Sequence, residues 1–160
     1  MTQTLQKDTP GLQVELLHHV SLPVRDLEIS RRFYAEVLSL REIPRPDFAF
    51  AGAWFQVAAG QLHLIVRAPG VDPKDASRPE PTYRLKKGID TRDIHFAVRV
   101  KSFSAALTHL NDSGYGENAE GKLKIQVNRP SKHRGAGFPQ IYVLDPDGHV
   151  IEINAQSEDS

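Results

Sequence analysis

The sequence predicts an α+β fold in which the order strand, helix, strand, strand, strand occurs twice. The chain has 160 residues, which is about the length of one domain. Short runs of alternating or β-branched residues are typical of strands, and two segments have apolar residues at helical spacing. Equivalent residues of the two halves lie the same number of positions apart in the sequence. His19 and His95 are separated by 76 positions (95 − 19 = 76), and so are Asp26 and Ser102 (102 − 26 = 76). Such an offset indicates an internal duplication.

The first half, residues 13–66, contains one predicted helix and four predicted strands. Asp26 is a typical N-cap residue, and the apolar residues that follow it recur at helical spacing as far as about Ser39. The strands are rich in Leu, Val, Ile and aromatic residues. We predict them at residues 15–24, 40–44, 50–58 and 61–66, with Ala59 and Gly60 forming the turn between the last two.

The second half, residues 93–155, repeats this order. Ser102 is placed to cap a helix that ends near Gly114. Asp145, Pro146, Asp147 and Gly148 have the residue types of a type I turn. We predict strands at residues 93–100, 122–128, 138–145 and 149–154. Residues 67–92 are rich in proline and glycine and are predicted to be a linker or excursion, and residues 1–12 and 156–160 are predicted to be flexible ends.

Composition excludes several function classes. Twenty basic and twenty acidic side chains give a net charge of zero, so we expect neither nucleic acid nor a membrane surface as a partner. The absence of cysteine excludes disulfides and thiolate chemistry. The N-terminal residues lack the pattern of a signal peptide, and we expect a cytoplasmic protein. The seven histidines remain as the residues best suited to bind a metal.

Strand alternation places four potential metal ligands on equivalent faces. Side chains alternate across a strand, and the apolar faces of these strands are expected to pack on the helices. His19, His63 and His95 lie on the opposite faces, as does Glu152. Imidazole and carboxylate groups suit zinc, nickel, cobalt, manganese or iron. Taken singly, each residue is more often an ordinary strand side chain, and alternation alone leaves both interpretations equally open.

Other residues could contact a substrate. Trp54 and Gln56 share one face of a predicted strand, and Gln140 and Tyr142 share one face of another, where ordinary packing explains them equally well. The loop 129–134 carries Lys132, His133 and Arg134, which could bind an anionic group or simply be solvated. The remaining histidines, His18, His109 and His149, are assigned structural or surface roles.

Three segments resemble the vicinal oxygen chelate superfamily, the group of glyoxalases, bleomycin-resistance proteins and dioxygenases. They are LLHHVSLPVRDLEISRRFYAEVLSL, DIHFAVRV and YVLDPDGHVIEIN, at residues 16–40, 93–100 and 142–154. The resemblance implies two βαβββ modules whose curved mixed sheets enclose a metal cavity. It maps the ligands to His19, His63, His95 and Glu152. It also implies a small-molecule substrate and a homodimer, with modules paired within or across chains.

The resemblance implies metal-dependent chemistry on a vicinal-oxygen substrate. We expect a glyoxalase-like isomerase, lyase or epimerase, with Glu152 as the catalytic base. The familiar glutathione-dependent glyoxalases usually have Glu where this chain has His63, which argues against lactoylglutathione lyase activity. The alternatives are a ring-cleaving or other iron-dependent dioxygenase, a fosfomycin-resistance-like transferase, and a non-catalytic drug- or metabolite-binding protein of the bleomycin-resistance type.

Overall fold

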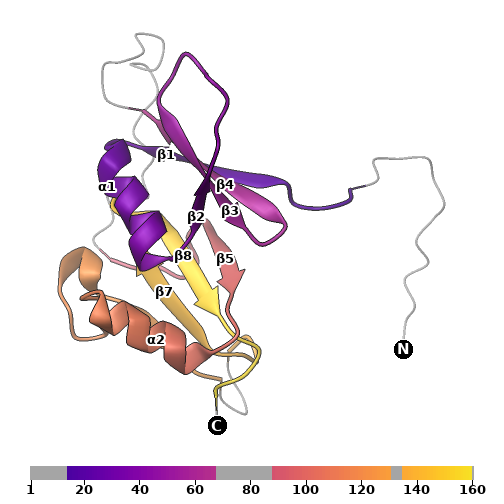
Figure 1. The fold of residues 1–160 in the computed structure, drawn as a ribbon. Helices are drawn as coiled ribbons and strands as arrows, with labels where there is room; N and C mark the ends of the chain where they lie inside the picture. Colours follow the sequence, from indigo (N-terminus) through magenta and orange to yellow (C-terminus); the bar gives the residue numbers. More distant parts are fainter. Residues whose placement is uncertain (1–13, 68–87, 131–134, 160) are drawn as a thin grey trace.

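The first half of the chain forms a four-stranded sheet with one helical segment. The structure is a computed structural model that describes residues 14–67, 88–130 and 135–159. The helical segment consists of α1 (Leu27–Arg32) and a π-helical stretch (Phe33–Val37). The strands are β1 (His19–Val24), β2 (Arg41–Ile43), β3 (Gly52–Val57) and β4 (Gly60–Val66), in the sheet order β1-β4-β3-β2 (Figure 1).

The second half repeats this arrangement. Its sheet contains β5 (His95–Arg99), β6 (Gln126–Asn128), β7 (Gln140–Leu144) and β8 (Val150–Asn154), in the order β5-β8-β7-β6. The helix α2 (Phe103–Asp112) follows β5, as α1 follows β1. In both sheets the first strand pairs in parallel with the last, and the other pairs are antiparallel. The predicted duplication and the α+β class are therefore confirmed.

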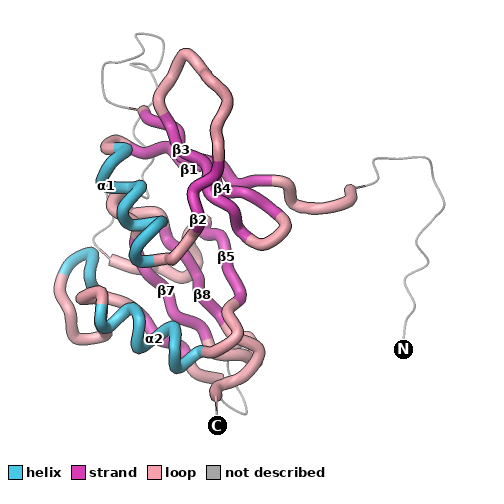
Figure 2. The backbone as a smooth tube through the Cα atoms, in the orientation of Figure 1, coloured by secondary structure: helices cyan, strands magenta, loops and turns pink. Residues whose placement is uncertain are grey.

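The two helices begin at the predicted residues. The side chain of Asp26 accepts a hydrogen bond from the backbone of Ile29 at 3.0 Å, and that of Ser102 accepts one from Ala105 at 3.0 Å. Figure 2 shows α1 and α2 on the same side of the molecule. The first helix was predicted as regular to about Ser39, but its second half is π-helical. This wider turn brings the adjacent Phe33 and Tyr34 into the core together.

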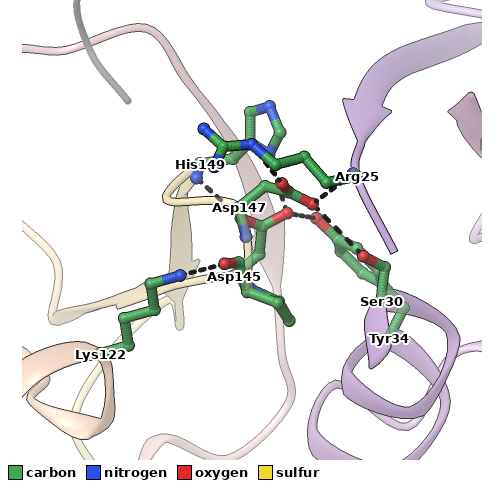
Figure 3. Close-up of polar contacts among 8 residues, drawn as sticks. Arg25, Ser30, Tyr34, Lys122, Asp145, Asp147 and His149 are labelled. Carbon is green, nitrogen blue, oxygen red and sulfur yellow. Dashed lines mark hydrogen bonds and ion pairs between the residues drawn. The ribbon is translucent and has the colours of Figure 1, made fainter. Parts of the chain in front are cut away.

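One hydrophobic core extends across both halves. It includes Phe55 and Leu64 of the first sheet, and Ile141 and Ile151 of the second, all of which are fully buried. A polar contact within this region also joins the halves, because the hydroxyl of Tyr34 donates to the buried carboxylate of Asp145 at 2.8 Å (Figure 3). The two modules therefore pack as one unit in this chain.

Arg25 and Asp147 make a second connection between the modules at the same place. The backbone N–H of Arg25 donates to Asp147 at 3.2 Å, and its guanidinium lies 3.7 Å from the same carboxylate. Figure 3 shows Asp147 facing both Arg25 and Ser30, which come from the first module. The turn predicted at residues 145–148 forms, with the backbone of Gly148 donating to Asp145 at 3.0 Å. This turn is therefore part of the contact between modules.

Several segments differ from their predicted extents. The strand predicted from residue 15 begins at His19, and the strand predicted at 122–128 is reduced to Gln126–Asn128 after a short 3-10 turn. Near the C-terminus, Asp159 accepts hydrogen bonds from Ser102 and Ser104, which holds the end of the described chain against α2. Residues 1–12 and most of the predicted linker, residues 68–87, lie outside the described part of the chain. Among the described helices, none has the length and apolar character needed to span a bilayer.

Candidate metal centre

His95 and Glu152 bring two potential ligand atoms together on the second sheet. They come from β5 and β8, which are parallel neighbours. Nε2 of His95 lies 3.5 Å from Oε2 of Glu152. Nδ1 of His95 donates to the backbone carbonyl of Asp93 at 2.7 Å. Because this hydrogen bond places the proton on Nδ1, Nε2 carries the lone pair that a metal requires.

Glu152 is held by a chain of buried polar side chains. Its Oε2 accepts a hydrogen bond from the hydroxyl of Tyr142 at 2.9 Å, and its Oε1 accepts one from Asn154 at 2.7 Å. Gln140 in turn donates to the hydroxyl of Tyr142 at 2.8 Å. All four side chains are buried. We call His95 and Glu152, with these supporting residues, the second half-site.

The hydrogen bonds that Glu152 accepts determine whether its carboxyl group is ionised. Burial by itself raises the pKa of this carboxyl group, but the hydrogen bonds from Asn154, Gln140 and Tyr142, together with His95, outweigh burial and lower the pKa below its ordinary value. The carboxylate is therefore ionised at neutral pH, which is the form that binds metal. The same shift makes Glu152 a weaker base than an unperturbed glutamate.

His19 and His63 form a second pair, on the first sheet. Their rings stack with centroids 4.4 Å apart, and the other face of His63 stacks on Trp54 at 4.0 Å. Nδ1 of His19 is hydrogen-bonded to Nδ1 of His18 at 2.9 Å, so Nε2 of His19 is its nitrogen for a metal. Nε2 of His63 is hydrogen-bonded to the side chain of Gln61 at 2.8 Å. We call His19 and His63 the first half-site.

His63 is held as the neutral imidazole. Burial lowers its pKa, and the positive charges that His19, His18 and Arg45 can carry lower it further. A neutral imidazole is the form that coordinates metals. In this arrangement Nε2 donates to Oε1 of Gln61, so Nδ1 carries the lone pair, and Nε2 can bind a metal only once this hydrogen bond is released. The first half-site is therefore chemically suited to a metal but is not arranged around one.

One residue of each half-site lines a common cavity, but the two half-sites stay separate within one chain. A cavity of about 710 Å³ is lined by His19 of β1 and His95 of β5, and by Leu17 and Ile94, which precede these strands. Within the described residues, no group of three or more His, Asp or Glu side chains could hold one metal ion. The four residues assigned to the metal thus come together as two pairs. Each pair has the donor atoms that suit zinc, nickel, cobalt, manganese or iron.

The residues predicted to contact substrate have different surroundings. Gln140 and Tyr142 support Glu152, and Trp54 packs on His63, so these three adjoin the half-sites. Gln56 instead donates to the carbonyls of Ala58 and Gly60, where it holds the turn between β3 and β4. Lys132, His133 and Arg134 lie outside the described residues.

His149 is a cavity residue that sequence reasoning placed in a purely structural role. It is buried, and its Nδ1 is hydrogen-bonded to Asp145 at 2.8 Å (Figure 3). It also lines the cavity shared by His19 and His95. The spacing of Asp145 and His149 around a tight turn could have predicted their hydrogen bond. The position of His149 in the cavity could not be predicted, because it depends on how β5 and β8 pair.

The other two histidines also make specific contacts. His18 was expected to pack toward the helix, but it is exposed, and its side chain is hydrogen-bonded to that of His19. His109 is exposed, as expected. Its Nε2 is hydrogen-bonded to the carbonyl of Val37 at 3.0 Å, which connects α2 to the first module.

Comparison with known proteins agrees with this architecture. The family model described as Glyoxalase/Bleomycin resistance protein/Dioxygenase superfamily matches residues 16–153. The chain belongs to this superfamily. It is 28% identical over 144 residues to Glyoxylase I 4 of Arabidopsis thaliana, covering 89% of this chain and 71% of that protein.

Solved structures show the same fold at low sequence identity. A glyoxylase/bleomycin resistance protein/dioxygenase domain from Frankia sp. EAN1pec aligns with a TM-score of 0.58 and 22% identity, over 89% of this chain and 98% of that one. Lactoylglutathione lyase from Agrobacterium tumefaciens aligns with a TM-score of 0.54 and 18% identity, over 89% and 94%. At these identities the likeness establishes the two βαβββ modules and no particular reaction.

Proposed function

We propose that this superfamily member is a divalent-metal enzyme with glyoxalase-like isomerase, lyase or epimerase chemistry on a small vicinal-oxygen substrate. The observation that carries the proposal is the second half-site. There, Nε2 of His95 and Oε2 of Glu152 lie 3.5 Å apart, and separate hydrogen bonds orient both side chains. Two oriented ligand atoms, each with its own supporting partner, are characteristic of built metal sites.

We propose that His19 and His63 supply the remaining ligands from a second chain. Within one chain the two pairs do not form a group of three ligands. Both β1 and β5 are edge strands, and the apolar Leu17 and Ile94 beside them are 76% and 92% exposed. Exposed apolar side chains at open sheet edges favour association. A twofold homodimer pairing the first half-site of each chain with the second half-site of the other would complete two centres.

The chemistry follows from the donors and their neighbours. A bound divalent metal would act as a Lewis acid toward the two oxygens of the substrate. Tyr142 and Asn154 orient the carboxylate of Glu152 and keep it ionised, so it can bind the metal and accept a proton next to the substrate carbonyl. The proton would be taken up at the Glu152 oxygen that one of these hydrogen bonds releases.

Metal content tests the first part of the proposal. Protein purified without an affinity tag should retain zinc, nickel, cobalt, manganese or iron, and metal-free protein should regain it on reconstitution. Less than about 0.1 equivalent per chain, unchanged after reconstitution, would contradict the proposal. Oxygen uptake with a catechol by an iron-loaded protein would replace the isomerase or lyase assignment with a dioxygenase.

Coexpression of two defective variants tests the pairing of modules. His63→Phe removes a ligand of the first half-site while keeping a ring between His19 and Trp54, and Glu152→Gln removes a ligand of the second. Neither variant alone should retain metal. Random pairing of the two should restore about a quarter of a metal ion per chain if each centre uses both chains. No restoration, despite heterodimer formation, would show that each centre is built within one chain.

A further inference from the structure

The ring stack of the first half-site continues beyond His63 to the protein surface. Trp54 packs on His63 with the two planes 6° apart, and Phe48 lies against Trp54 at 6.0 Å between centroids. Phe50 stacks on Phe48 at 5.3 Å. Phe48 is 41% exposed and Phe50 is 46% exposed. A series of ring contacts, stacked except for the tilted contact between Phe48 and Trp54, therefore leads from the proposed metal ligand to solvent.

Arg45 adds a positive charge to the exposed end of this stack. The central carbon of its guanidinium lies 4.7 Å from the ring centre of Phe48 and 5.0 Å from that of Phe50. Its N–H groups donate to the carbonyls of Phe50, at 2.6 Å, and Pro46, at 3.4 Å. In the described residues no carboxylate pairs with Arg45. A guanidinium has more donors than these two carbonyls occupy, so it can also bind a carboxylate.

The backbone leaves room for this position of Arg45. A Cβ atom added at Gly52 would lie 3.3 Å from Nε of Arg45, and 2.3 Å from the carbonyl oxygen of Leu64. Gly52 begins β3, so the Arg45 side chain crosses the start of the strand that carries Trp54. Bound carbonyls, ring faces and the missing side chain at Gly52 together hold the guanidinium in one place. We call Arg45, Phe48, Phe50 and Trp54 the aromatic subsite.

We propose that the aromatic subsite binds a planar, conjugated portion of the substrate that carries a carboxylate. Ring faces favour a flat partner, and a guanidinium favours an anion that can accept parallel N–H groups. Trp54 of the subsite contacts His63, so a substrate that extends past Trp54 would reach the proposed metal ligands. This inference rests on the proposed function, for which it names the substrate class. The whole chain is neutral, so selection for an anion depends on a local charge such as Arg45.

Three small probes separate the two properties of the proposed substrate. Benzoate has both a ring and a carboxylate, cyclohexanecarboxylate has only the charge, and benzyl alcohol has only the ring. Trp54 is the only tryptophan of the chain, so quenching of its fluorescence reports binding at the subsite. The titrations use the full chain freed of metal, because a carboxylate could otherwise bind the ion directly. Benzoate should bind about tenfold more tightly than either other probe.

Variants assign this preference to Arg45. Arg45→Met keeps an apolar side chain over the rings but removes the charge, and it should weaken benzoate binding about tenfold without changing that of benzyl alcohol. Lys101→Met removes one exposed positive charge from the other module and should change neither. Phe50→Leu should reduce the preference for benzoate over cyclohexanecarboxylate, and circular dichroism confirms that each variant is folded.

The outcomes distinguish this inference from the proposed function. Equal binding of benzoate and cyclohexanecarboxylate, no benzoate binding, or unchanged benzoate binding by Arg45→Met would overturn the aromatic subsite. Burial of Phe48 and Phe50 between two copies of the chain would also overturn it. In that case the protein would be a dimer, and Phe48→Ala would dissociate it. Metal retention is measured separately. If the protein retains metal but shows no benzoate preference, the function stands and the subsite fails; the reverse result contradicts the function alone.

Discussion

The two half-sites hold their potential ligands in different ways. In the second, Asp93 orients His95, and Tyr142 and Asn154 hold both oxygens of Glu152. In the first, His19 and His63 are held by stacking, and Nε2 of His63 is occupied by a hydrogen bond to Gln61. The neighbours of the second half-site orient its ligands, whereas in the first Gln61 occupies one ring nitrogen of His63.

Burial explains the contrast. Every residue of β7 and β8 is buried, so the polar side chains on these strands must satisfy one another. β1 is an edge strand, and His19 at its start is exposed. His63 is buried beside it, but it is held by ring stacking and by one hydrogen bond, to Gln61, rather than by a network. We therefore expect the second half-site to dominate metal affinity and the first to adjust when metal binds.

The largest effect is expected from Glu152→Gln. This change removes the charge of the second half-site while keeping the size of the side chain. Loss of a supporting partner costs ten- to a hundredfold in metal affinity, so loss of the ligand itself should cost at least about a hundredfold. Calorimetric titration with zinc or nickel measures it. Affinity within tenfold of the unaltered protein would mean that Glu152 is not a ligand.

Tyr142→Phe should have the next largest effect. The Tyr142 hydroxyl donates to Glu152, so its removal should reduce metal affinity about tenfold or more. It should also raise the pKa of Glu152, because burial already opposes the charge and one stabilising hydrogen bond is lost. Protons would then compete with metal up to a higher pH, which moves the pH midpoint of metal binding upward. Tyr115→Phe, which alters a partly buried tyrosine outside both half-sites, should leave this midpoint in place.

Gln61→Leu should have a smaller effect, with the opposite sign. It removes the hydrogen bond that occupies Nε2 of His63. Because such a bond contributes about 1 kcal/mol net, metal affinity should rise by a factor of about five or less. The same titration measures the change. A loss of affinity as large as that of Tyr142→Phe would show that Gln61 orients His63 rather than competing with the metal.

The smallest effect is expected from lowering the pH, which should quench the fluorescence of the metal-free protein. Trp54 stacks on His63, and a protonated imidazole quenches an excited indole. Burial, together with the charges of His19, His18 and Arg45, lowers the pKa of His63, so the midpoint of quenching should lie below the ordinary value of 6.5. A pH titration of the emission measures the midpoint, and Trp54 is the sole tryptophan. A midpoint at or above 6.5 would mean that His63 is open to solvent.

Local sequence patterns predicted which helices and strands form better than they predicted where each begins and ends. Asp26 and Ser102 marked both helices because a capping side chain acts on backbone groups three residues away. The π-helical stretch at Phe33–Val37 was missed, because it depends on packing of Phe33 and Tyr34 in a core shared by both modules. The late start of β1 was missed for a similar reason, since a strand begins where its partner β4 offers hydrogen bonds.

The sequence by itself determined the duplicated βαβββ order, the ligand types available and the alternation that puts His19, His63, His95 and Glu152 away from the helices. These properties follow from residue spacing along one chain. Only the tertiary structure decided that the four residues meet as two pairs, that Tyr142 and Asn154 hold Glu152, and that Arg45 lies over the rings that lead to His63. Such contacts depend on strand pairing and side-chain burial, which join residues far apart in the chain.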